Sequence, residues 1–291
     1  MKKGITMKKL ALIFALLLVS LALFSCSSYK LVAKDAKDSD GNAVTGYYDK
    51  NDTLIYEEKL DSDGKVAKKT SYDYSGRVEK IEEFHKGNKS AESVFTYEED
   101  DKYTKTQTVY NNKGEQVSVK ETKFEKGLPV SEKNTVNVKN GDPSVQESTF
   151  TYNDDGSVLE VITSGDKKIR EVLTSKDENV LWDCEYAEAG TSIKTHYNED
   201  GIAAKTESYN KDGALVMYVV NEYNDNKKIT GSKTYDSTDA IKSYSTYVYD
   251  EAGEKLRAIY RYNADGTINS TITYDENGKS TIHSGTFVPL D

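Results

Sequence analysis

The sequence predicts an all-β protein, in which roughly 18–20 short strands follow an N-terminal signal helix and form a long antiparallel meander, a curved repeat sheet. The first observation is the pattern Tyr-Asp/Asn-x-x-Gly, which occurs eight times. The second is spacing, because the seven tyrosines from Tyr197 to Tyr274 that precede an Asp or Asn lie 12 to 14 residues apart. The third is alternation of apolar and polar residues in the intervening segments. Connections this short allow antiparallel pairing only.

Residues 1–25 are expected to be a signal peptide. Lys8 and Lys9 precede an apolar run over residues 10–23, and small residues follow it. The run is shorter than the ~20 residues that a membrane-spanning helix requires. Because Met7 repeats the Met-Lys-Lys start, translation from Met1 and translation from Met7 both remain open.

The residues Leu23-Phe24-Ser25-Cys26 resemble the lipobox of bacterial lipoproteins. The resemblance implies that Cys26 becomes the first residue of the mature protein and carries a lipid that anchors the chain to a membrane. Ser27 stands where an Asp would act as a retention signal. The resemblance therefore implies the outer membrane of a Gram-negative-type bacterium, on its periplasmic or surface face. The mostly polar residues 26–46 are expected to be a tether that carries the lipidated Cys26.

Each copy of the repeat pattern has the chemistry of a hairpin turn. The Asx side chain accepts hydrogen bonds from the backbone ahead of it, and Gly supplies the positive φ of a bulged turn. The tyrosine ends one strand, and an apolar residue returns two positions after the glycine at Val66, Val78, Val158, Leu215 and Ile268. The repeat-motif residues are Tyr72, Gly76, Tyr110, Gly114, Tyr152, Gly156, Tyr197, Gly201, Tyr209, Gly213, Tyr249, Gly253, Tyr262, Gly266, Tyr274 and Gly278.

Incomplete copies and weaker turns fill the gaps between these motifs. Tyr48, Tyr223 and Tyr235 keep Tyr-Asx but lack the glycine. Residues 47–291 are therefore expected to form a single β-repeat domain with unpaired edges at Tyr47 and near Val288, where Pro289 would blunt the last strand. Strands with so few large apolar residues depend on stacking between neighbours. The strand over residues 214–223 is apolar on both faces and is expected to be covered on both.

The segment Tyr72-Asp73-Tyr74-Ser75-Gly76-Arg77-Val78 resembles the YD repeats of the RHS family. MORN-like bacterial repeat proteins are similar in pattern. The resemblance covers most of residues 47–280 and implies a spiralling β-sheet. The chain is too short for the toxin-enclosing shells of RHS proteins.

The composition excludes several classes of protein. A net charge of -10 argues against nucleic-acid binding, which relies on clustered Lys and Arg. Two cysteines exclude a disulfide-rich scaffold and a zinc site of four cysteines.

Motifs that would carry catalysis are missing. The three histidines, His85, His196 and His283, are spread over the repeats, and none belongs to a His-Glu-x-x-His pattern. Ser62-Asp63-Gly64-Lys65 matches Ser-x-x-Lys but lies in an expected turn. We therefore expect no enzyme, no catalytic residue, no cofactor and no metal site.

Two features have structural explanations. Cys184 alternates onto one face with Trp182 and is expected to be a small buried apolar side chain. Oxygen-rich turns at residues 38–41, 61–64 and 153–156 resemble calcium ligands, but turn chemistry explains the same residues and none completes an EF-hand loop.

The 22 tyrosines are the remaining candidate surface. They either form the core of a thin sheet or expose an aromatic ladder on one face for a protein or glycan partner. The leading hypothesis is a lipid-anchored, non-enzymatic β-repeat protein of the cell envelope with a binding or scaffold role. The alternative is a structural, accessory or antitoxin-like repeat protein without a small ligand.

Overall fold

The computed structural model describes residues 31–37, 43–138 and 141–290, and these contain 21 β-strands and no helix. All strands belong to one antiparallel sheet, so the predicted all-β meander is confirmed with slightly more strands than expected. The signal helix, the signal peptide and Cys26 lie outside the described residues.

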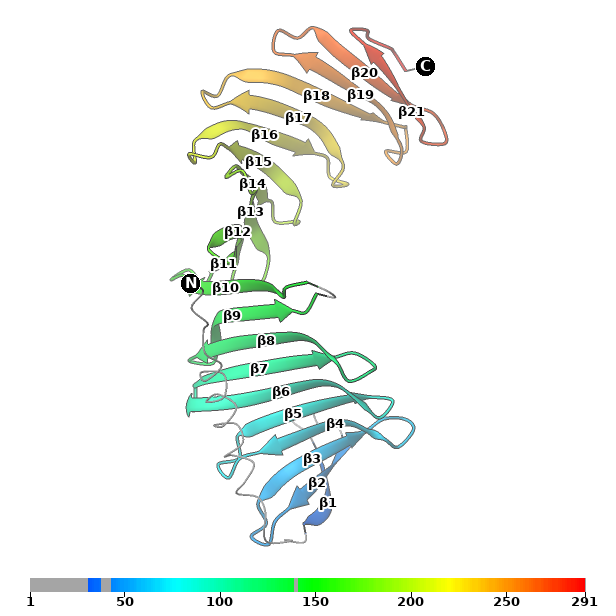
Figure 1. Ribbon diagram of the computed structural model, residues 1–291. Helices are drawn as coiled ribbons and strands as arrows, with labels where there is room; N and C mark the ends of the chain where they lie inside the picture. Colours follow the sequence, from blue (N-terminus) through cyan, green and yellow to red (C-terminus); the bar gives the residue numbers. More distant parts are fainter. Residues whose placement is uncertain (1–30, 38–42, 139–140, 291) are drawn as a thin grey trace. The chain divides into compact units, whose positions relative to one another are not determined.

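The described residues fall into two compact units, and the first comprises residues 31–94 with 112–114. Its strands pair in sequence order and form one layer (Figure 1). They are β1 (Val32–Lys37), β2 (Ala43–Tyr48), β3 (Leu54–Leu60), β4 (Val66–Tyr72), β5 (Val78–His85) and the first part of β6 (Asn88–Glu99).

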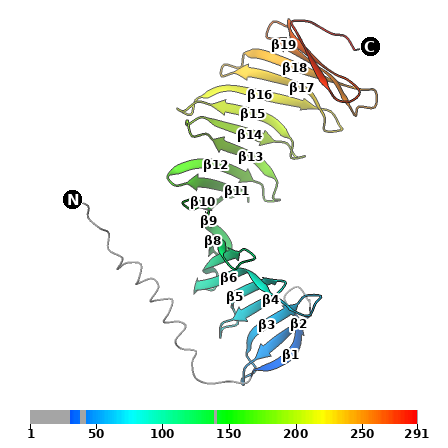
Figure 2. The same ribbon diagram turned by 45° about the vertical axis from the view of Figure 1, so that its right-hand side comes forward.

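The second unit comprises residues 95–111 and 115–290. Its strands again follow one another as a single layer (Figure 2). They are β7 (Lys102–Tyr110), β8 (Gln116–Glu125), β9 (Leu128–Val136), β10 (Ser144–Tyr152), β11 (Val158–Ser164), β12 (Lys167–Thr174), β13 (Val180–Tyr186), β14 (Ser192–Tyr197), β15 (Ala203–Tyr209), β16 (Leu215–Tyr223), β17 (Ile229–Asp236), β18 (Ile241–Tyr249), β19 (Leu256–Asn263), β20 (Ile268–Tyr274) and β21 (Ser280–Ser284).

The sheet begins upstream of the position predicted from sequence. Strand β1 and most of β2 lie within residues 26–46, which were expected to be a tether. The prediction of a tether is therefore wrong over these two strands. Both strands have only six residues, and β1 carries Lys34, Asp35 and Lys37, so neither shows a long alternation of apolar and polar residues. Val44 is nevertheless buried, and Tyr47 stacks on Tyr56 with ring centroids 4.4 Å apart.

The repeat turns have the predicted geometry. Asp73 Oδ1 accepts the backbone N–H groups of Ser75 and Arg77, each at 2.9 Å, and Gly76 adopts a φ of 79°. All eight motif glycines have φ between 68° and 83°, a conformation that costs other L-residues about 1–2 kcal/mol. In the incomplete copies, Asp52, Lys227 and Asp239 take the same conformation with φ of 61° to 65°. The hydrogen-bonded turn therefore forms even where glycine is missing.

Few apolar side chains are buried, as expected for a thin sheet. The buried apolar residues of the described chain are Val44, Ala91, Cys184, Ala258, Ile259, Tyr260 and Ile272. The expectation that the strand over 214–223 is covered on both faces is wrong, because Val216 and Met217 on β16 keep 49% and 38% of their surface exposed. In a single layer no second sheet is available to cover them.

A C-terminal strap, residues 285–288, covers one face of β19 and β20. The Phe287 ring stacks on Tyr260 with centroids 4.8 Å apart, and the Tyr260 hydroxyl donates to the Val288 carbonyl at 2.9 Å. Thr271 Oγ1 donates to the Thr286 carbonyl at 2.7 Å. The strap buries Tyr260 and Thr271 at an end of the sheet where further strands are lacking among the described residues. The last strand ends at Ser284, so Pro289 does not blunt it as predicted.

Candidate binding surface

One face of the second unit brings aromatic and charged side chains into register across eight strands. Residues paired in an antiparallel sheet point to the same side, so the registers define a common face, which we call the Trp182 face. Its first row runs Leu173, Trp182, His196, Lys205, Val220, Lys233, Tyr244 and Tyr262 from β12 to β19. Its second row runs Glu171, Cys184, Lys194, Glu207, Tyr218 and Tyr235 from β12 to β17.

The aromatic rings of this face stack in pairs and carry lysines above them. The rings of Tyr218 and Tyr235 stack at 4.8 Å, and those of Tyr244 and Tyr262 at 4.5 Å. Lys205 Nζ lies 4.4 Å from the centroid of Tyr218. In the same way, Lys194 Nζ lies 3.7 Å above Trp182. These tyrosines are half-buried, so each ring keeps part of its surface accessible. The face can therefore stack against a partner through several rings at once.

Glu207 is the electrostatic centre of the Trp182 face. Its carboxylate lies 2.9 Å from His196 Nε2, 2.7 Å from the Tyr209 hydroxyl and 2.7 Å from Lys205 Nζ. Burial disfavours the ionised carboxyl, but the hydrogen bonds from Lys205, His196 and Tyr209 outweigh it and lower the Glu207 pKa to about 2. Burial and the bond to Glu207 raise the pKa of Tyr209 to about 12. Groups whose pKa values lie this far from 7 are poor proton-transfer catalysts near pH 7.

A shallow hollow of about 260 Å³ adjoins this centre. Its lining residues are Glu171, Trp182, Cys184, Tyr186, Ser192, Lys194, Tyr209 and Gly213. The Glu171 carboxylate accepts the Tyr186 hydroxyl at 2.6 Å and lies 2.7 Å from Lys168 Nζ. Burial and the hydrogen bond to Glu171 raise the pKa of Tyr186. Cys184 is only 5% exposed beside Trp182, which confirms the predicted buried thiol.

A second hollow of about 250 Å³ lies on the opposite face, over β7 to β10. Phe124, Pro129 and Phe150 line it together with Lys105, Gln107, Lys120, Thr122 and Glu132. Lys120 Nζ contacts Glu132 at 2.6 Å, and the Tyr103 ring stacks on Phe124 at 4.6 Å. Both faces of the second unit therefore offer aromatic surface.

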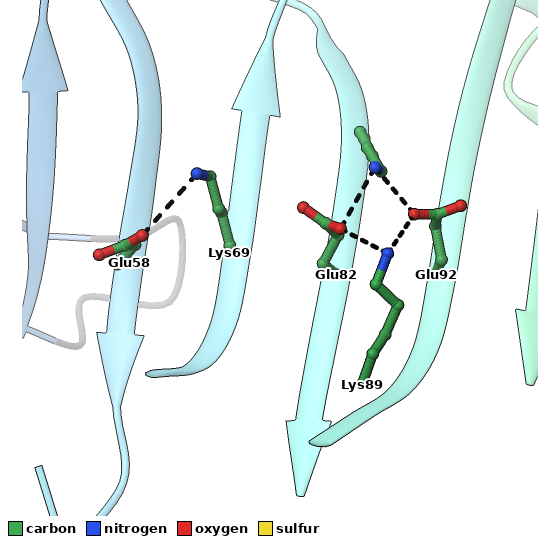
Figure 3. Close-up of polar contacts among 6 residues, drawn as sticks. Glu58, Lys69, Glu82, Lys89 and Glu92 are labelled. Atoms are coloured by element: carbon green, nitrogen blue, oxygen red, sulfur yellow. Dashed lines mark hydrogen bonds and ion pairs between the residues drawn. The ribbon is translucent and has the colours of Figure 1, made fainter. Parts of the chain in front are cut away.

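The first unit carries a compact square of four charges. Lys80 and Lys89 each contact both Glu82 and Glu92, at distances of 2.7 to 3.2 Å. Figure 3 shows Glu82, Lys89 and Glu92 pointing toward one another from β5 and β6. Burial opposes ionisation, but the mutual hydrogen bonds prevail, so the pKa values of both glutamates are lowered and those of both lysines are raised. The charges of this square neutralise one another.

Next to the square, aromatic and charged groups share the same face of β2 to β4. Lys69 Nζ lies 3.8 Å from Glu58 (Figure 3) and 3.7 Å from the Tyr56 ring centroid. The Tyr47 hydroxyl donates to Glu58 at 3.1 Å, and burial together with that carboxylate raises the Tyr47 pKa. The combination of stacked tyrosines, lysine and glutamate therefore recurs in both units.

Several strand-end tyrosines have a structural role that the sequence did not reveal. The hydroxyls of Tyr152, Tyr223 and Tyr249 donate to the carbonyls of Pro129, Ala203 and Ile229, at 2.8 to 2.9 Å. Each bond ties the end of one strand to the start of the preceding strand. The only hint in the sequence is the constant place of tyrosine before the turn. Most repeat-motif residues thus form turns and strand ties along the sheet. Tyr209, Gly213 and Tyr262 also belong to the Trp182 face or its hollow.

The three histidines lie on separate strands, β5, β14 and β21, and oxygens of the described turns accept backbone hydrogen bonds. His85 is exposed, His196 Nε2 lies 2.9 Å from Glu207, and His283 Nε2 lies 3.2 Å from Thr273 Oγ1. Asp61 Oδ1 is occupied by the backbone N–H groups of Asp63 and Lys65, each at 2.9 Å. Within the described ranges, no group of three His, Cys, Asp or Glu residues is placed to hold a metal ion.

The turn at residues 38–41 lies outside the described residues. Over the part of the chain that the structure describes, no helix has the length and apolarity to span a membrane.

Comparisons with known proteins leave the family undefined. No protein-family model and no curated protein matches the chain. Solved structures that align with it include a porin-like protein from Bacteroides uniformis ATCC 8492, at 16% identity and a TM-score of 0.25, over 65% of this chain and 61% of that one. Another is TcdB2-TccC3-TEV, at 11% identity and a TM-score of 0.25, over 91% of this chain and 18% of that one.

A third is the Photorhabdus luminescens Tc holotoxin pore with the TccC3 D651A mutation, at 10% identity and a TM-score of 0.21, over 84% of this chain and 19% of that one. The chain thus spans about three fifths of the porin-like protein and about a fifth of the toxin chains. TM-scores this low establish neither a shared fold nor a shared function.

Proposed function

We propose that the chain is a lipid-anchored β-repeat protein of the bacterial cell envelope that binds or scaffolds a partner and catalyses no reaction. The observation that carries this proposal is the Trp182 face, where stacked rings and paired charges lie in register on a sheet with no covering layer among the described strands. The lipobox-like residues that end at Cys26 supply the anchoring part of the proposal.

The electrostatics of this face favour binding over catalysis. Although burial opposes ionisation, hydrogen bonds from Lys205, His196 and Tyr209 lower the pKa of Glu207 to about 2, and these three partners contact both of its oxygens. Within the described ranges every buried side-chain polar atom has a hydrogen-bond partner. Such groups hold the rings in place, and the rings supply contact area at low entropic cost for a peptide or glycan partner.

The structural, accessory alternative rests on a different observation. The square formed by Lys80, Glu82, Lys89 and Glu92 cancels its own charges and offers little to a partner. If the first unit acts only as a spacer, its square would serve the stability of β5 and β6.

A matched pair of substitutions on β18 tests the binding proposal. Tyr244 lies on the Trp182 face, whereas Tyr247 pairs with Ile259 on the opposite face of the same strand. The lipidated protein in detergent is applied to arrays of cell-wall glycans and peptides. Tyr244→Ala is expected to weaken retention at least about fivefold, in the range of lost aromatic contacts, while Tyr247→Ala leaves it unchanged.

The melting temperature of each variant separates binding from folding. Equal losses of retention and of melting temperature in both variants would show that the tyrosines are only core, and the structural alternative would then stand.

A further inference from the structure

The outer edge of β21 is open in the described structure. Among the described strands, β21 pairs only with β20. Its residues are exposed except for the half-buried His283, and the Ile282 side chain keeps 65% of its surface accessible. The strap that follows turns inward over β19 and β20, so it leaves this edge uncovered.

Two hydrogen bonds show which residues direct their backbone groups outward. The Gly285 N–H donates to the backbone carbonyl of Asn269 at 2.7 Å, and the Asp275 N–H donates to the backbone carbonyl of Lys279 at 3.1 Å. Inward bonds in an antiparallel pair recur at every second residue, which assigns them to Thr281 and His283. The N–H and C=O groups of Ser280, Ile282 and Ser284 therefore point away from β20. The Ser284 carbonyl accepts the Thr286 hydroxyl at 3.3 Å and keeps one lone pair for a further donor.

This edge lacks the protection that exposed edges usually have. Natural edge strands carry lysine, other charges or proline, which discourage pairing with another chain. Strand β21 has the sequence Ser-Thr-Ile-His-Ser and contains none of these. Strand β1, by contrast, carries Lys34, Asp35 and Lys37.

An apolar row also stops abruptly at β21. Ile259, Ile272 and Ile282 are partners in register on β19, β20 and β21. The first two are 8% and 7% exposed, whereas Ile282 is 65% exposed. A further strand beside β21 would extend the row and cover Ile282.

We propose that a second copy of this chain occupies this edge, with its own β21 paired antiparallel across a two-fold axis at Ile282. In this register Ser280 faces Ser284 of the other copy, and Ile282 faces its own equivalent. All outward N–H and C=O groups then find partners, because the outward residues of one copy meet only outward residues of the other. Thr281 faces the second His283, and the isoleucine row continues into the other molecule.

The sequence of β21 is compatible with this symmetry. An isologous interface requires a self-complementary surface, and Ser-Thr-Ile-His-Ser pairs like with like at its centre and at its ends. No like charges of lysine, arginine, aspartate or glutamate oppose one another. This dimer is independent of the ligand of the Trp182 face, so the two proposals can fail separately.

A cysteine cross-link tests the register in membranes that hold the lipidated full chain. Ile282→Cys treated with a short bis-maleimide is expected to give a covalent homodimer. Ile193→Cys is the matched control, because Ile193 is 53% exposed but lies on the interior strand β14. Equal cross-linking of both variants, no dimer of Ile282→Cys, or cross-linking of Ile282→Cys to a different protein would overturn the proposal.

A charge placed at the two-fold axis provides the second test. Ile282→Lys brings two like charges together while it leaves the inward bonds of β21 intact, so the protein mass in detergent, measured by light scattering, is expected to fall twofold. Ile193→Lys is expected to keep the mass of the wild type. Circular dichroism verifies that both variants fold. A wild-type protein with the mass of a monomer at all concentrations would contradict the dimer.

Discussion

Glu207 shows how a buried charge is held on a sheet with almost no core. The carboxylate is surrounded by one lysine, one histidine and one tyrosine that come from β14 and β15. Its desolvation is compensated by charge-assisted hydrogen bonds, which are stronger than neutral ones. Removal of the charge should therefore weaken the sheet more than removal of an exposed charge nearby.

We predict that Glu207→Gln lowers the free energy of unfolding at pH 7 by about 2 kcal/mol, the usual worth of hydrogen bonds to a charged group. The measurement is urea unfolding followed by the fluorescence of Trp182, the single tryptophan of the chain. Glu185→Gln is the control, because Glu185 is exposed on β13. A loss of the same size in both variants would contradict a special role for Glu207.

The comparison of wild type with Glu207→Gln also predicts that the stability contributed by Glu207 depends on pH. The folded state lowers the Glu207 pKa from its ordinary value of 4.5 to about 2. The stabilisation is therefore fully present above pH 4.5 and is lost as the pH falls toward 2. The difference between wild type and Glu207→Gln should shrink over this range, and a difference that stays constant from pH 7 to pH 2 would refute the assignment.

The turns show what single residues contribute to the repeat. Asp52, Lys227 and Asp239 occupy the left-handed position that glycine holds in the complete motifs. In each case the Asx residue at the start of the turn still accepts the same backbone bonds, as Asn224 does from Asn226 and Lys228. The Asx contribution is thus sufficient to fix the turn, and glycine relieves the strain.

At the scale of elements, the strap explains where the densest packing lies. Ala258 and Thr271 are fully buried, and both lie on the two strands that the strap crosses. Residues 285–288 cover one face of these two strands from outside the repeat pattern, whereas the outer edge of β21 stays open.

We predict that Phe287→Ala lowers the free energy of opening of β19 and β20 by about 1 kcal/mol. An aromatic pair contributes about 0.5–1.5 kcal/mol in addition to the burial of its surface. Hydrogen–deuterium exchange over residues 256–274 measures the effect, and exchange over β12 to β15 should stay unchanged. Pro289→Ala is the control, because Pro289 is exposed next to the strap. Equal exchange in wild type and Phe287→Ala would show that the strap does not hold these strands.

At the scale of the whole molecule, we predict that membrane attachment depends on Cys26. Radiolabelled palmitate is expected to appear on the wild-type protein and to disappear in Cys26→Ala. Cys184→Ala is the control, because that thiol is buried and lies far along the chain in β13. Label that persists in Cys26→Ala would refute the lipid anchor at this position.

The sequence by itself determined the all-β class, the order of the strands and the geometry of their turns. These features depend on residues within a few positions of one another, such as Asp73 and Gly76, so local chemistry is enough to predict them. It also placed Cys184 beside Trp182 on one face, because alternation along a single strand is local too.

Only the tertiary structure decided which side chains meet across strands. The pairing of Glu207 with His196, the ties of the strand-end tyrosines, the exposed faces of β16 and the strap over Tyr260 all join residues from different strands. Their contacts depend on register and on whether a second layer is present. A one-residue shift in register would exchange the two faces, and no local pattern fixes that choice.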